Sequence, residues 1–553
     1  MIMKKNFMKG LLMLAAGVFV VSCADYNVTD NFAAEPDPTI TEPYKDLAPV
    51  KTYIDRSKNP NMSLGVTLKV VDYNKQALAH AAAMTNFDNL AFGTSLMSGT
   101  IVNAKGVMNF IDMKDLLDHV EEIDGDVFGS PIVANANQAD EWLKTLTSPI
   151  EIAVDPIQDK YVDYTQMETF TGTVLKGKPA IVKNYDGSDN ALKLPKRSKT
   201  YIVEGFEADT LGTYTVTFYA KVDKDETVIC TFSGNKIQEG KGDKLYAIKA
   251  GKWVKVVVEA MPAEGVTEGY LMVEGNLNSE VYIKNVNVVH TPDNHRPQTA
   301  EEKRDTLNYA LNAWCNGLMK INDGRIKSFD LIDEAIDSKA ELENGMLDLK
   351  HSTDKIFWQD VFGCEEYAPA VSKAAIAAYQ NYGGDPAELK FFISEAGLAD
   401  QKRFESLKYW IGVWEAKGAK IDGINAKLSL TYSEDEATQA ENVASFDKLL
   451  ANLVSTGKLI RLSNFDIKYQ NASGENVGAK DITTEQRQKL ADYYAYIIKS
   501  YMSNVPSDKQ AGLCKGNMVD TSDPVGLWSK DATSGDWVRT ATYKAFCDAL
   551  SGK

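Results

Sequence analysis

The sequence predicts an α/β protein, a (β/α)8 TIM barrel with an all-β sandwich inserted into it. The first observation is a set of eight short apolar runs, most of which precede a stretch of helical periodicity, as in parallel β/α units. The second is a central region where apolar and polar residues alternate at every second position. The chain has 553 residues, 44% hydrophobic and 25% charged, which excludes collagen-like, coiled-coil and wholly disordered classes.

The eight apolar runs are the expected barrel strands. They cover residues 64–70, 89–93, 126–133, 326–331, 389–393, 421–430, 458–466 and 511–515. The expected helices cover residues 75–84, 113–123, 301–319, 367–379, 403–417, 435–454, 484–501 and 540–550. Because these strands and helices follow one another along the chain, we expect a parallel sheet that closes into a barrel.

The expected sandwich interrupts the third strand–helix unit. Residues 214–222 alternate between apolar and polar side chains, and turns that contain glycine separate this strand from its neighbours. The pattern predicts the sandwich at 156–295 and the two parts of the barrel at 51–155 and 296–553. Insertion into an exposed loop is tolerated because the chain ends of a compact domain often lie close together.

The N-terminus carries a processing signal. Residues 1–22 contain three lysines followed by a short apolar run, and small residues precede Cys23. This resembles a bacterial lipoprotein signal, whose cleavage leaves Cys23 as the lipidated N-terminus; a plain secretory signal is the alternative. Residues 23–50 are polar and proline-rich and are expected to form a tether. Membrane attachment is then expected through the lipid alone, at the outer membrane, on the cell surface or on its periplasmic side.

Composition excludes several kinds of partner. The net charge of −17 argues against a nucleic-acid footprint. Five histidines and no CxxC pair argue against a dedicated metal enzyme, so we expect no metal and no cofactor. Once Cys23 is lipidated, an odd number of widely spaced cysteines remains, which does not indicate a disulfide framework.

Several barrel segments resemble glycoside hydrolase family 10, the endo-1,4-β-xylanases. The segment FDLIDEAI at 329–336 is similar to the strand-4 motif W-D-V-V-N-E-A, and LKFFISE at 389–395 is similar to the strand-5 motif. The segment TGKLIRLSNFD at 456–466 resembles the strand-7 segment that ends I-T-E-L-D. The resemblance implies the TIM barrel, and family members of the Bacteroidetes type also imply a lipoprotein with an inserted sandwich like a carbohydrate-binding module.

The same resemblance places the catalytic carboxyl groups of a retaining glycosidase, which face each other across the scissile bond. The acid/base position falls on Glu334 and is retained. The nucleophile position falls on Asn464, whose neutral amide cannot form a glycosyl ester. Glu395 and Asp466 lie near strand ends and are the candidates for a displaced carboxylate.

Other sugar-binding positions of the family are also changed. Asparagine becomes Asp333, a W-H pair ends in Asn135, and Q-x-H becomes Lys427 and Ser429 at its two ends. The strand-2 segment N-x-M-K becomes 94–97, and the strand-8 tryptophan aligns near Gly516. In the barrel, the candidate contacts for a polysaccharide are Asp333, Asn135, Lys427, Ser429 and Trp528. In the sandwich they are Trp253 and Tyr219, because aromatic faces can stack on sugar rings. Trp358, Trp410 and Trp414 are expected to be packing residues.

These observations favour a lipid-anchored protein that binds xylan or a related plant cell-wall polysaccharide on a catalytically degenerate barrel. Glycan-uptake proteins of the outer membrane are its candidate partners. The first alternative is a glycoside hydrolase of the endo-1,4-β-xylanase type that hydrolyses O-glycosyl bonds with a weak or displaced carboxylate. The second is a scaffold lipoprotein that binds no sugar.

Overall fold

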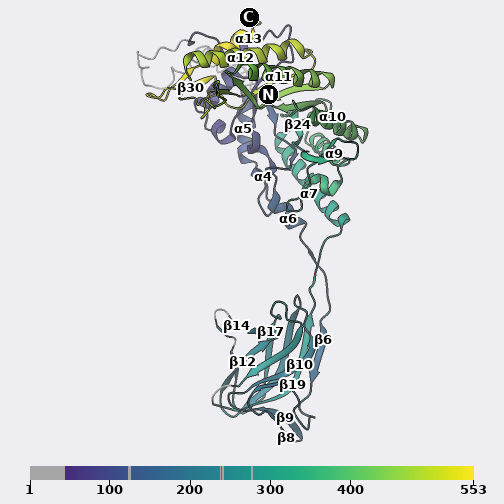
Figure 1. The fold of residues 1–553 in the computed structure, drawn as a ribbon. Helices are drawn as coiled ribbons and strands as arrows, with labels where there is room; N and C mark the ends of the chain where they lie inside the picture. The colour runs from purple at the N-terminus through teal and green to yellow at the C-terminus, as the bar shows by residue number, and fades with distance from the viewer. Residues whose placement is uncertain (1–43, 123–125, 237, 240–241, 244, 276–277) are drawn as a thin grey trace, which may run out of the picture. The chain divides into compact units, whose positions relative to one another are not determined.

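The computed structural model describes residues 44–122, 126–236, 238–239, 242–243, 245–275 and 278–553. The chain divides into two compact units, which are taken separately below. One unit contains the residues up to Ser148 together with Thr299–Lys553, and the other is Pro149–Gln298 (Figure 1). The second unit therefore extends a few residues beyond the expected 156–295 at each end.

The first unit is a closed barrel of eight parallel strands. They are β1 (Leu64–Thr67), β2 (Asn89–Ala91), β3 (Asp126–Gly129), β21 (Ser328–Asp333), β24 (Lys390–Ala396), β25 (Gly423–Lys427), β27 (Leu459–Ser463) and β29 (Gln510–Lys515). Each strand pairs in parallel with the next, and β29 pairs with β1, where Leu513 is opposite Leu64. The predicted (β/α)8 barrel is confirmed, and all eight strands lie where the apolar runs placed them.

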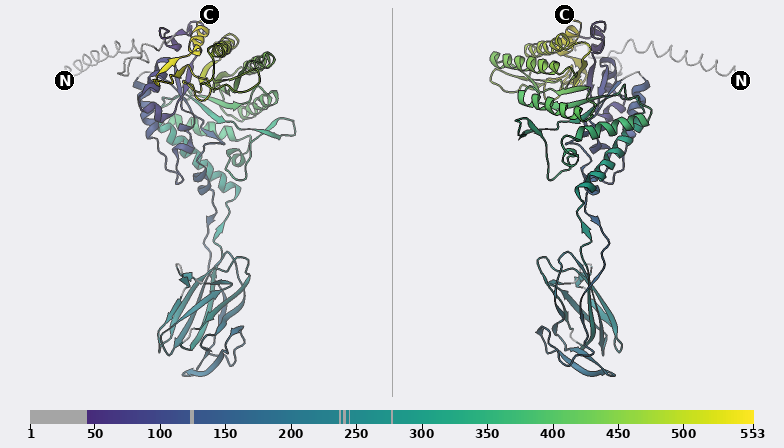
Figure 2. Two further views of the ribbon diagram at one scale, coloured as in Figure 1. Left: turned by 60° about the vertical axis from the view of Figure 1, so that its left-hand side comes forward. Right: turned by 90° about the vertical axis from the view of Figure 1, so that its right-hand side faces the viewer.

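Helices surround this barrel on its outside (Figure 2). The longer ones are α3 (Leu78–Asn86), α5 (Ile111–Glu122), α6 (Asp140–Leu146), α7 (Ala300–Asn322), α9 (Tyr367–Asn381), α10 (Gln401–Ala416), α11 (Glu436–Ser455), α12 (Thr484–Asn504) and α13 (Ala541–Leu550). Helix α7 begins after Thr299, whose hydroxyl accepts from the Glu302 N–H while the Glu302 side chain accepts from the Thr299 N–H. Such a reciprocal cap satisfies two N–H groups that the first turn leaves free. Short turns complete the layer: η1 (Val50–Tyr53), α2 (Val70–Asn74), η2 (Gly93–Leu96), α4 (Ser98–Ile101) and α8 (Trp358–Phe362).

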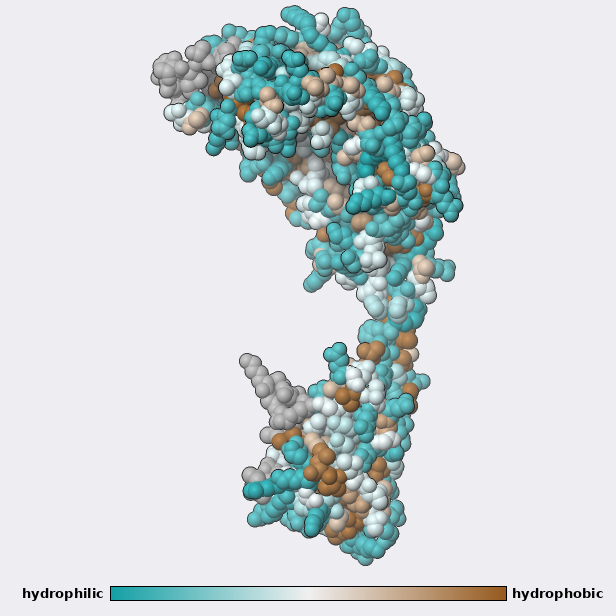
Figure 3. Space-filling model, viewed as in Figure 1, coloured by the Kyte–Doolittle hydropathy of each residue, from teal (hydrophilic) through white to brown (hydrophobic). Residues whose placement is uncertain are grey.

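The helices contact the sheet through apolar and aromatic side chains. Trp410 and Trp414 of α10 and Trp358 of α8 are all buried, as expected for packing residues. Trp410 stacks on Trp414 at 5.9 Å, and the indole N–H of each donates to a backbone carbonyl, so burial leaves neither donor unpaired. On the outside, the visible face of this unit is mainly hydrophilic with scattered apolar residues (Figure 3).

The chain is already packed against the barrel before residue 50. Val50 is fully buried, and Arg539 Nη1 donates to the carbonyls of Tyr44, Lys45 and Leu47 at 2.8–2.9 Å. The Tyr543 hydroxyl of α13 donates to Ala48 O at 3.0 Å. The expected tether at 23–50 is therefore corrected at its end, since 44–50 form part of the folded unit; Cys23 and the expected signal at 1–22 lie outside the described residues.

The second unit is a sandwich of two antiparallel sheets. One contains β7 (Val174–Lys176), β10 (Lys199–Glu207), β12 (Glu226–Phe232), β13 (Asn235–Lys236), β16 (Leu245–Ile248) and β18 (Glu268–Glu274). The other contains β6 (Ile157–Val162), β8 (Ala180–Asp186), β9 (Asp189–Leu194), β11 (Thr213–Val222), β17 (Val254–Ala260) and β19 (Val281–Thr291). A pair of two-residue strands, β14 (Gln238–Glu239) and β15 (Gly242–Asp243), lies outside both sheets. The predicted inserted β-sandwich is confirmed.

Alternation along β11 produces the core of this sandwich. Tyr214, Val216 and Phe218 are fully buried and face residues of the other sheet in one apolar cluster. Tyr219, of opposite parity, is 42% exposed. This is the pattern expected where one face of a sheet packs and the other meets water.

Several short strands lie outside the main sheets of the two units. In the barrel unit, β4 (Val133–Ala134) pairs in parallel with the end of β21. Three further pairs are formed by β22 (Ile336–Glu341) with β23 (Leu347–Leu349), β26 (Leu430–Ser433) with β28 (Ile467–Gln470), and β30 (Trp528–Lys530) with β31 (Trp537–Arg539). In the other unit, β5 (Ile150–Glu151) pairs with β20 (His295–Arg296). Across the described ranges, no helix has both the length and the apolar character that crossing a bilayer requires.

Candidate functional site

A cavity of about 450 Å³ opens where the barrel strands end. Seven of the eight strands contribute side chains to it, because their carboxyl ends meet at the same rim. Residues from the strands that line it are Thr67, Ala91, Phe128, Gly129, Asp330, Asp333, Asn425, Lys427, Arg461, Ser463 and Cys514. Glu334 and Asn464, which immediately follow β21 and β27, line the same cavity, so the structure brings the two positions of the expected carboxyl pair together.

Glu334 is held in place through both its backbone and its side chain. Its φ is +45°, a left-handed conformation, and its N–H donates to Ser394 O of β24 at 2.8 Å. Its Oε1 accepts from Lys427 Nζ at 2.9 Å. Lys427 Nζ also lies 2.5 Å from Asp333 Oδ1, so a single ammonium is shared between two carboxylates.

Lys427 changes what Glu334 can do. Burial opposes ionisation of Glu334, but the hydrogen bond and charge of Lys427, with Lys350 and Arg403, outweigh it and lower the pKa of this carboxyl. The general acid of a glycosidase needs the opposite, a raised pKa that keeps its proton for the leaving oxygen. Asp333 and Glu334 in turn hold the pKa of Lys427 above its usual range although burial acts against it, so the arrangement is a stable ion cluster.

Asn464 occupies the matching position directly after β27. Its φ is +52°, close to that of Glu334, and it is exposed to solvent. It lines the central cavity and also an adjoining cavity of about 570 Å³. The backbone conformation at 464 thus matches that at Glu334, but the side chain is an uncharged amide.

The floor of the cavity contains polar groups that the sequence did not single out. Asp330 is buried, and burial, with the charge of Asp333, raises its pKa to about 8 although Asn425 Nδ2 donates to both of its oxygens. The Arg461 guanidinium is 1% exposed and stacks over the Phe128 ring at 3.9 Å. Its Nε and Nη1 have no hydrogen-bond partner among the described residues.

Asn135, an expected binding residue, is also a buried polar residue at the central cavity. It is 8% exposed and lines the cavity, and neither atom of its amide has a hydrogen-bond partner within the described part of the chain. A buried amide without partners costs free energy unless another molecule satisfies it. Asn135 and Arg461 therefore offer hydrogen-bonding capacity to a polar ligand.

Two other expected contacts lie elsewhere. Ser429 is exposed but lines only the adjoining cavities, not the central one. Trp528 is fully buried and packs edge-on against Tyr543 at 5.3 Å. Its selection as a ligand contact is corrected here, because no face of its ring is open to a sugar.

The sandwich carries the remaining two candidates, Trp253 and Tyr219. Trp253 is half-buried just before β17, and its indole N–H donates to Asp186 Oδ2 at 2.7 Å. Lys284 Nζ lies 4.6 Å above its ring, which occupies one face with a cation. Tyr219 is exposed on β11 and is the more open of the two rings.

The candidates for a displaced carboxylate are both engaged away from the central cavity. Glu395 of β24 is buried; its Oε1 accepts from Arg403 Nη2 of α10 at 2.7 Å and its Oε2 accepts from the Ile336 N–H at 3.3 Å. Asp466 contacts Lys515 Nζ and accepts from Asn517 Nδ2 at 2.7 Å, in the adjoining cavity. A Cβ at Gly516 would approach Asp466 Oδ2 to 2.6 Å, so this carboxylate occupies the space that a larger residue at 516 would need.

This fold and this cavity define the class, a (β/α)8 TIM-barrel protein with a polar cavity at the carboxyl ends of its strands. The family model of glycosyl hydrolase family 10 matches residues 288–522. The barrel is accordingly that of a protein like the family 10 xylanases.

Solved structures agree on the fold. Xylanase B from Clostridium stercorarium F9 superposes with a TM-score of 0.51 at 11% identity, covering 91% of this chain and 100% of that one. Xylanase 10C from Cellvibrio japonicus superposes with a TM-score of 0.51 at 12% identity, covering 94% of this chain and 75% of that one. A search of curated protein sequences found no match.

Proposed function

We propose that this protein binds a polysaccharide in a family 10 barrel that no longer hydrolyses it. The observation that carries the proposal is the pair at the mouth: an amide at Asn464 opposite an ionised Glu334 paired with Lys427. Retaining hydrolysis needs a carboxylate that attacks and a carboxylic acid that donates a proton, and neither state is available here. Loss of a nucleophile alone raises the barrier by at least several kcal/mol, on the order of a thousandfold in rate or more.

Binding does not depend on the lost groups. The amide of Asn135 and two donor groups of Arg461, which have no hydrogen-bond partner among the described residues, suit sugar hydroxyls, and Asp333 and Lys427 line the same cavity. The ligand class follows from the family: the structures of similar fold are xylanases, so xylan or a related plant cell-wall polysaccharide is the proposed ligand. Tyr219 on the sandwich is the proposed second contact, through ring stacking.

The experiment measures retention and hydrolysis on one preparation. The chain from residue 24 onward is run through affinity gels that contain xylan, and the same protein is incubated with xylan and assayed for reducing ends. We expect retarded migration without product. Asn135→Ala should weaken retardation, while Asn308→Ala, an exposed position on α7, should leave it unchanged.

The other outcomes are equally informative. Product above the background of a denatured sample would overturn the proposal in favour of a hydrolase with another nucleophile. Neither product nor retardation on any plant glycan would favour a scaffold that binds no sugar. Retardation unchanged by Asn135→Ala but lost in Tyr219→Ala would move the binding surface to the sandwich.

The proposal includes a lipid anchor at Cys23 that attaches the protein to the outer membrane, on the cell surface or its periplasmic side. The lysines, the apolar run and the cysteine within the first 23 residues support it. Glycan-uptake proteins of that membrane are the proposed partners. Cells fed a radioactive fatty acid should label the wild-type chain and not Cys23→Ala; equal labelling of both, or labelling of neither, would overturn the anchor.

A further inference from the structure

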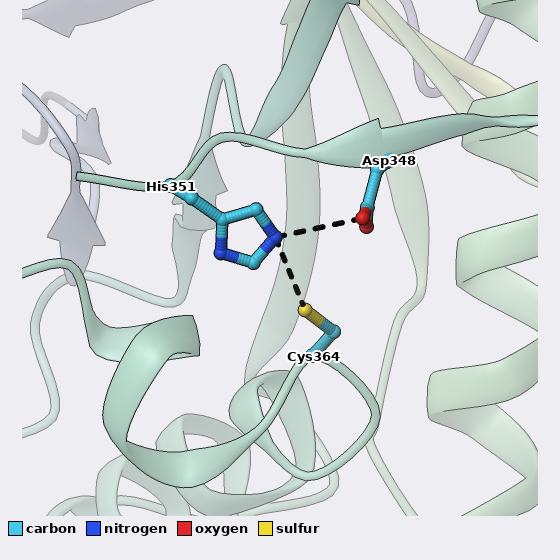
Figure 4. A group of neighbouring side chains, drawn as sticks. All are labelled: Asp348, His351 and Cys364. Atoms are coloured by element: carbon cyan, nitrogen blue, oxygen red, sulfur yellow. Dashed lines mark hydrogen bonds and ion pairs between the residues drawn. The ribbon is translucent and has the colours of Figure 1, made fainter. Parts of the chain in front are cut away.

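Three side chains with metal-binding atoms converge beside the barrel, outside the cavity described above. Asp348 belongs to β23, His351 follows that strand by two residues, and Cys364 lies between α8 and α9 (Figure 4). His351 Nε2 lies 3.5 Å from Asp348 Oδ2 and 4.0 Å from Cys364 Sγ. One donor atom from each residue falls within 4.8 Å of the other two.

We infer that Asp348, His351 and Cys364 form a binding site for a zinc-type divalent cation. A thiolate, an imidazole nitrogen and a carboxylate oxygen are the donors that zinc takes in proteins, at about 2.0–2.3 Å from the metal. In a tetrahedron of that size, neighbouring donors are roughly 3.3–3.6 Å apart. The distance from His351 Nε2 to Asp348 Oδ2 already fits this spacing, and the distance from His351 Nε2 to Cys364 Sγ exceeds it by a few tenths of an ångström. The carboxylate of Asp348 and the thiol of Cys364 lie within 4.8 Å of each other and would draw together around a metal, and the fourth position remains for water.

A fourth residue orients the histidine for this task. Asp360 of α8 contacts His351 Nδ1, and its other oxygen accepts from the Ser352 N–H at 3.1 Å. A carboxylate at Nδ1 fixes the proton on that nitrogen and directs Nε2 to the metal, as in the carboxylate–histidine–zinc arrangement. An ordinary surface ion pair explains the two aspartates, but it does not explain why a thiol faces the same nitrogen.

The site has both access and a structural consequence. The side chain of His351 is 46% exposed and that of Asp348 is 22% exposed, so a metal can enter from solvent. The chain between His351 and Cys364 includes Phe357, and Lys350 immediately precedes it; both line the central cavity. A bound cation would therefore fix the segment that forms one wall of the mouth.

The test uses reduced, purified full-length protein titrated with Co²⁺ and with Zn²⁺. We expect one equivalent of cobalt to produce the near-ultraviolet charge-transfer band of a cobalt–thiolate bond, and zinc to displace it. Cys364→Ser and His351→Gln should abolish the band and weaken zinc binding at least tenfold. Asp360→Asn should weaken it by about tenfold, the usual effect of removing a partner of a ligating histidine.

His295→Gln is the matched control, because His295 also pairs with an aspartate, Asp293 at 3.1 Å, but has no thiol in that pair. It should change neither the band nor the affinity. Circular dichroism checks folding, and Asp348→Asn replaces any ligand variant that fails to fold. No thiolate band in the wild type, or equal zinc affinity in Cys364→Ser, would overturn the site and leave an ion pair only.

Discussion

The two sides of the barrel mouth each pair a lysine with carboxylate, and they do so differently. Lys427, on the side of β25, is 22% exposed and is shared by Asp333 and Glu334. Lys515, on the side of β29, has a fully buried side chain; it contacts Asp466 and donates to the carbonyls of Phe465 and Val525 at 2.9 and 2.7 Å.

The surroundings of the two lysines shift their pKa values in opposite directions. Two carboxylates hold the pKa of Lys427 above its usual range against burial, whereas burial outweighs Asp466 and lowers the pKa of Lys515. Lys515 ties β29 to the segments that contain Phe465 and Val525, while Lys427 lowers the pKa of Glu334 at the central cavity. A lysine beside a carboxylate can thus be structural or functional, and its other partners distinguish the two roles.

Replacing the buried lysine should have the largest effect on stability. Lys515→Met removes the ammonium that pairs with Asp466 and donates to two carbonyls, although Asn517 Nδ2 still donates to Asp466. Breaking a buried pair costs about 3–5 kcal/mol. Urea unfolding should show this loss, with little change in the slope. A loss under about 1 kcal/mol would mean that Lys515 is not a structural tie.

Asp330→Asn should flatten the pH dependence of stability. The pKa of Asp330 is about 8 in the folded protein, above its unfolded value of 3.8. The folded state therefore keeps a proton that the unfolded state releases, and stability falls as pH rises from about 4 to 8, by up to about 1.4 kcal/mol per pH unit. Thermal unfolding across this range measures the difference, and parallel curves for the two proteins would contradict the assignment.

Removing the half-buried Lys427 should cost less stability. Lys427→Met leaves the carboxylates of Asp333 and Glu334 without the ammonium between them. The free energy of unfolding should fall by roughly 1–2 kcal/mol near neutral pH, which lies between the values for surface and buried pairs. Because Lys427 lowers the pKa of Glu334, the stabilisation is present above the unfolded pKa of 4.5 and is lost as pH falls through the folded value. The difference in free energy of unfolding between wild type and Lys427→Met should therefore become smaller at acidic pH. A difference that becomes larger there would refute the pairing of Lys427 with Glu334.

The smallest expected effect is on the hydrolysis of xylan after a carboxylate is placed at position 464. Asn464→Glu alone should release no product from xylan, because Glu334 remains ionised beside Lys427. Adding Lys427→Gln raises the pKa of Glu334 and should give slow hydrolysis, since general acid catalysis is worth about 10²–10⁴-fold. Equal product from the single and double variants would show that Lys427 does not limit the acid.

The sequence predicts the strands of the barrel better than it predicts the polar residues at the floor of the central cavity. Eight apolar runs were enough for the barrel strands, because burial between two layers selects such runs. Asp330 and Arg461 escaped notice because each interrupts an apolar run, and only closure of the barrel turns them into one cavity. Trp528 was expected to contact a ligand, but β30 pairs with β31 and the Trp528 side chain is fully buried.

The group at Asp348, His351 and Cys364 shows another limit of sequence reasoning. Asp348 and His351 are near neighbours, but Cys364 lies beyond α8 and has no recognisable metal-ligand spacing. Family resemblance, by contrast, predicts that positions 334 and 464 face each other, and Glu334 and Asn464 do line one cavity.

The left-handed backbone at these two positions has a thermodynamic consequence. Asparagine tolerates a positive φ better than glutamate does, so Asn464 relaxes a conformation that strains Glu334. A glutamate placed at position 464 would therefore make the fold less stable than asparagine does. Such a backbone position is expected to keep a glutamate only where a function requires it.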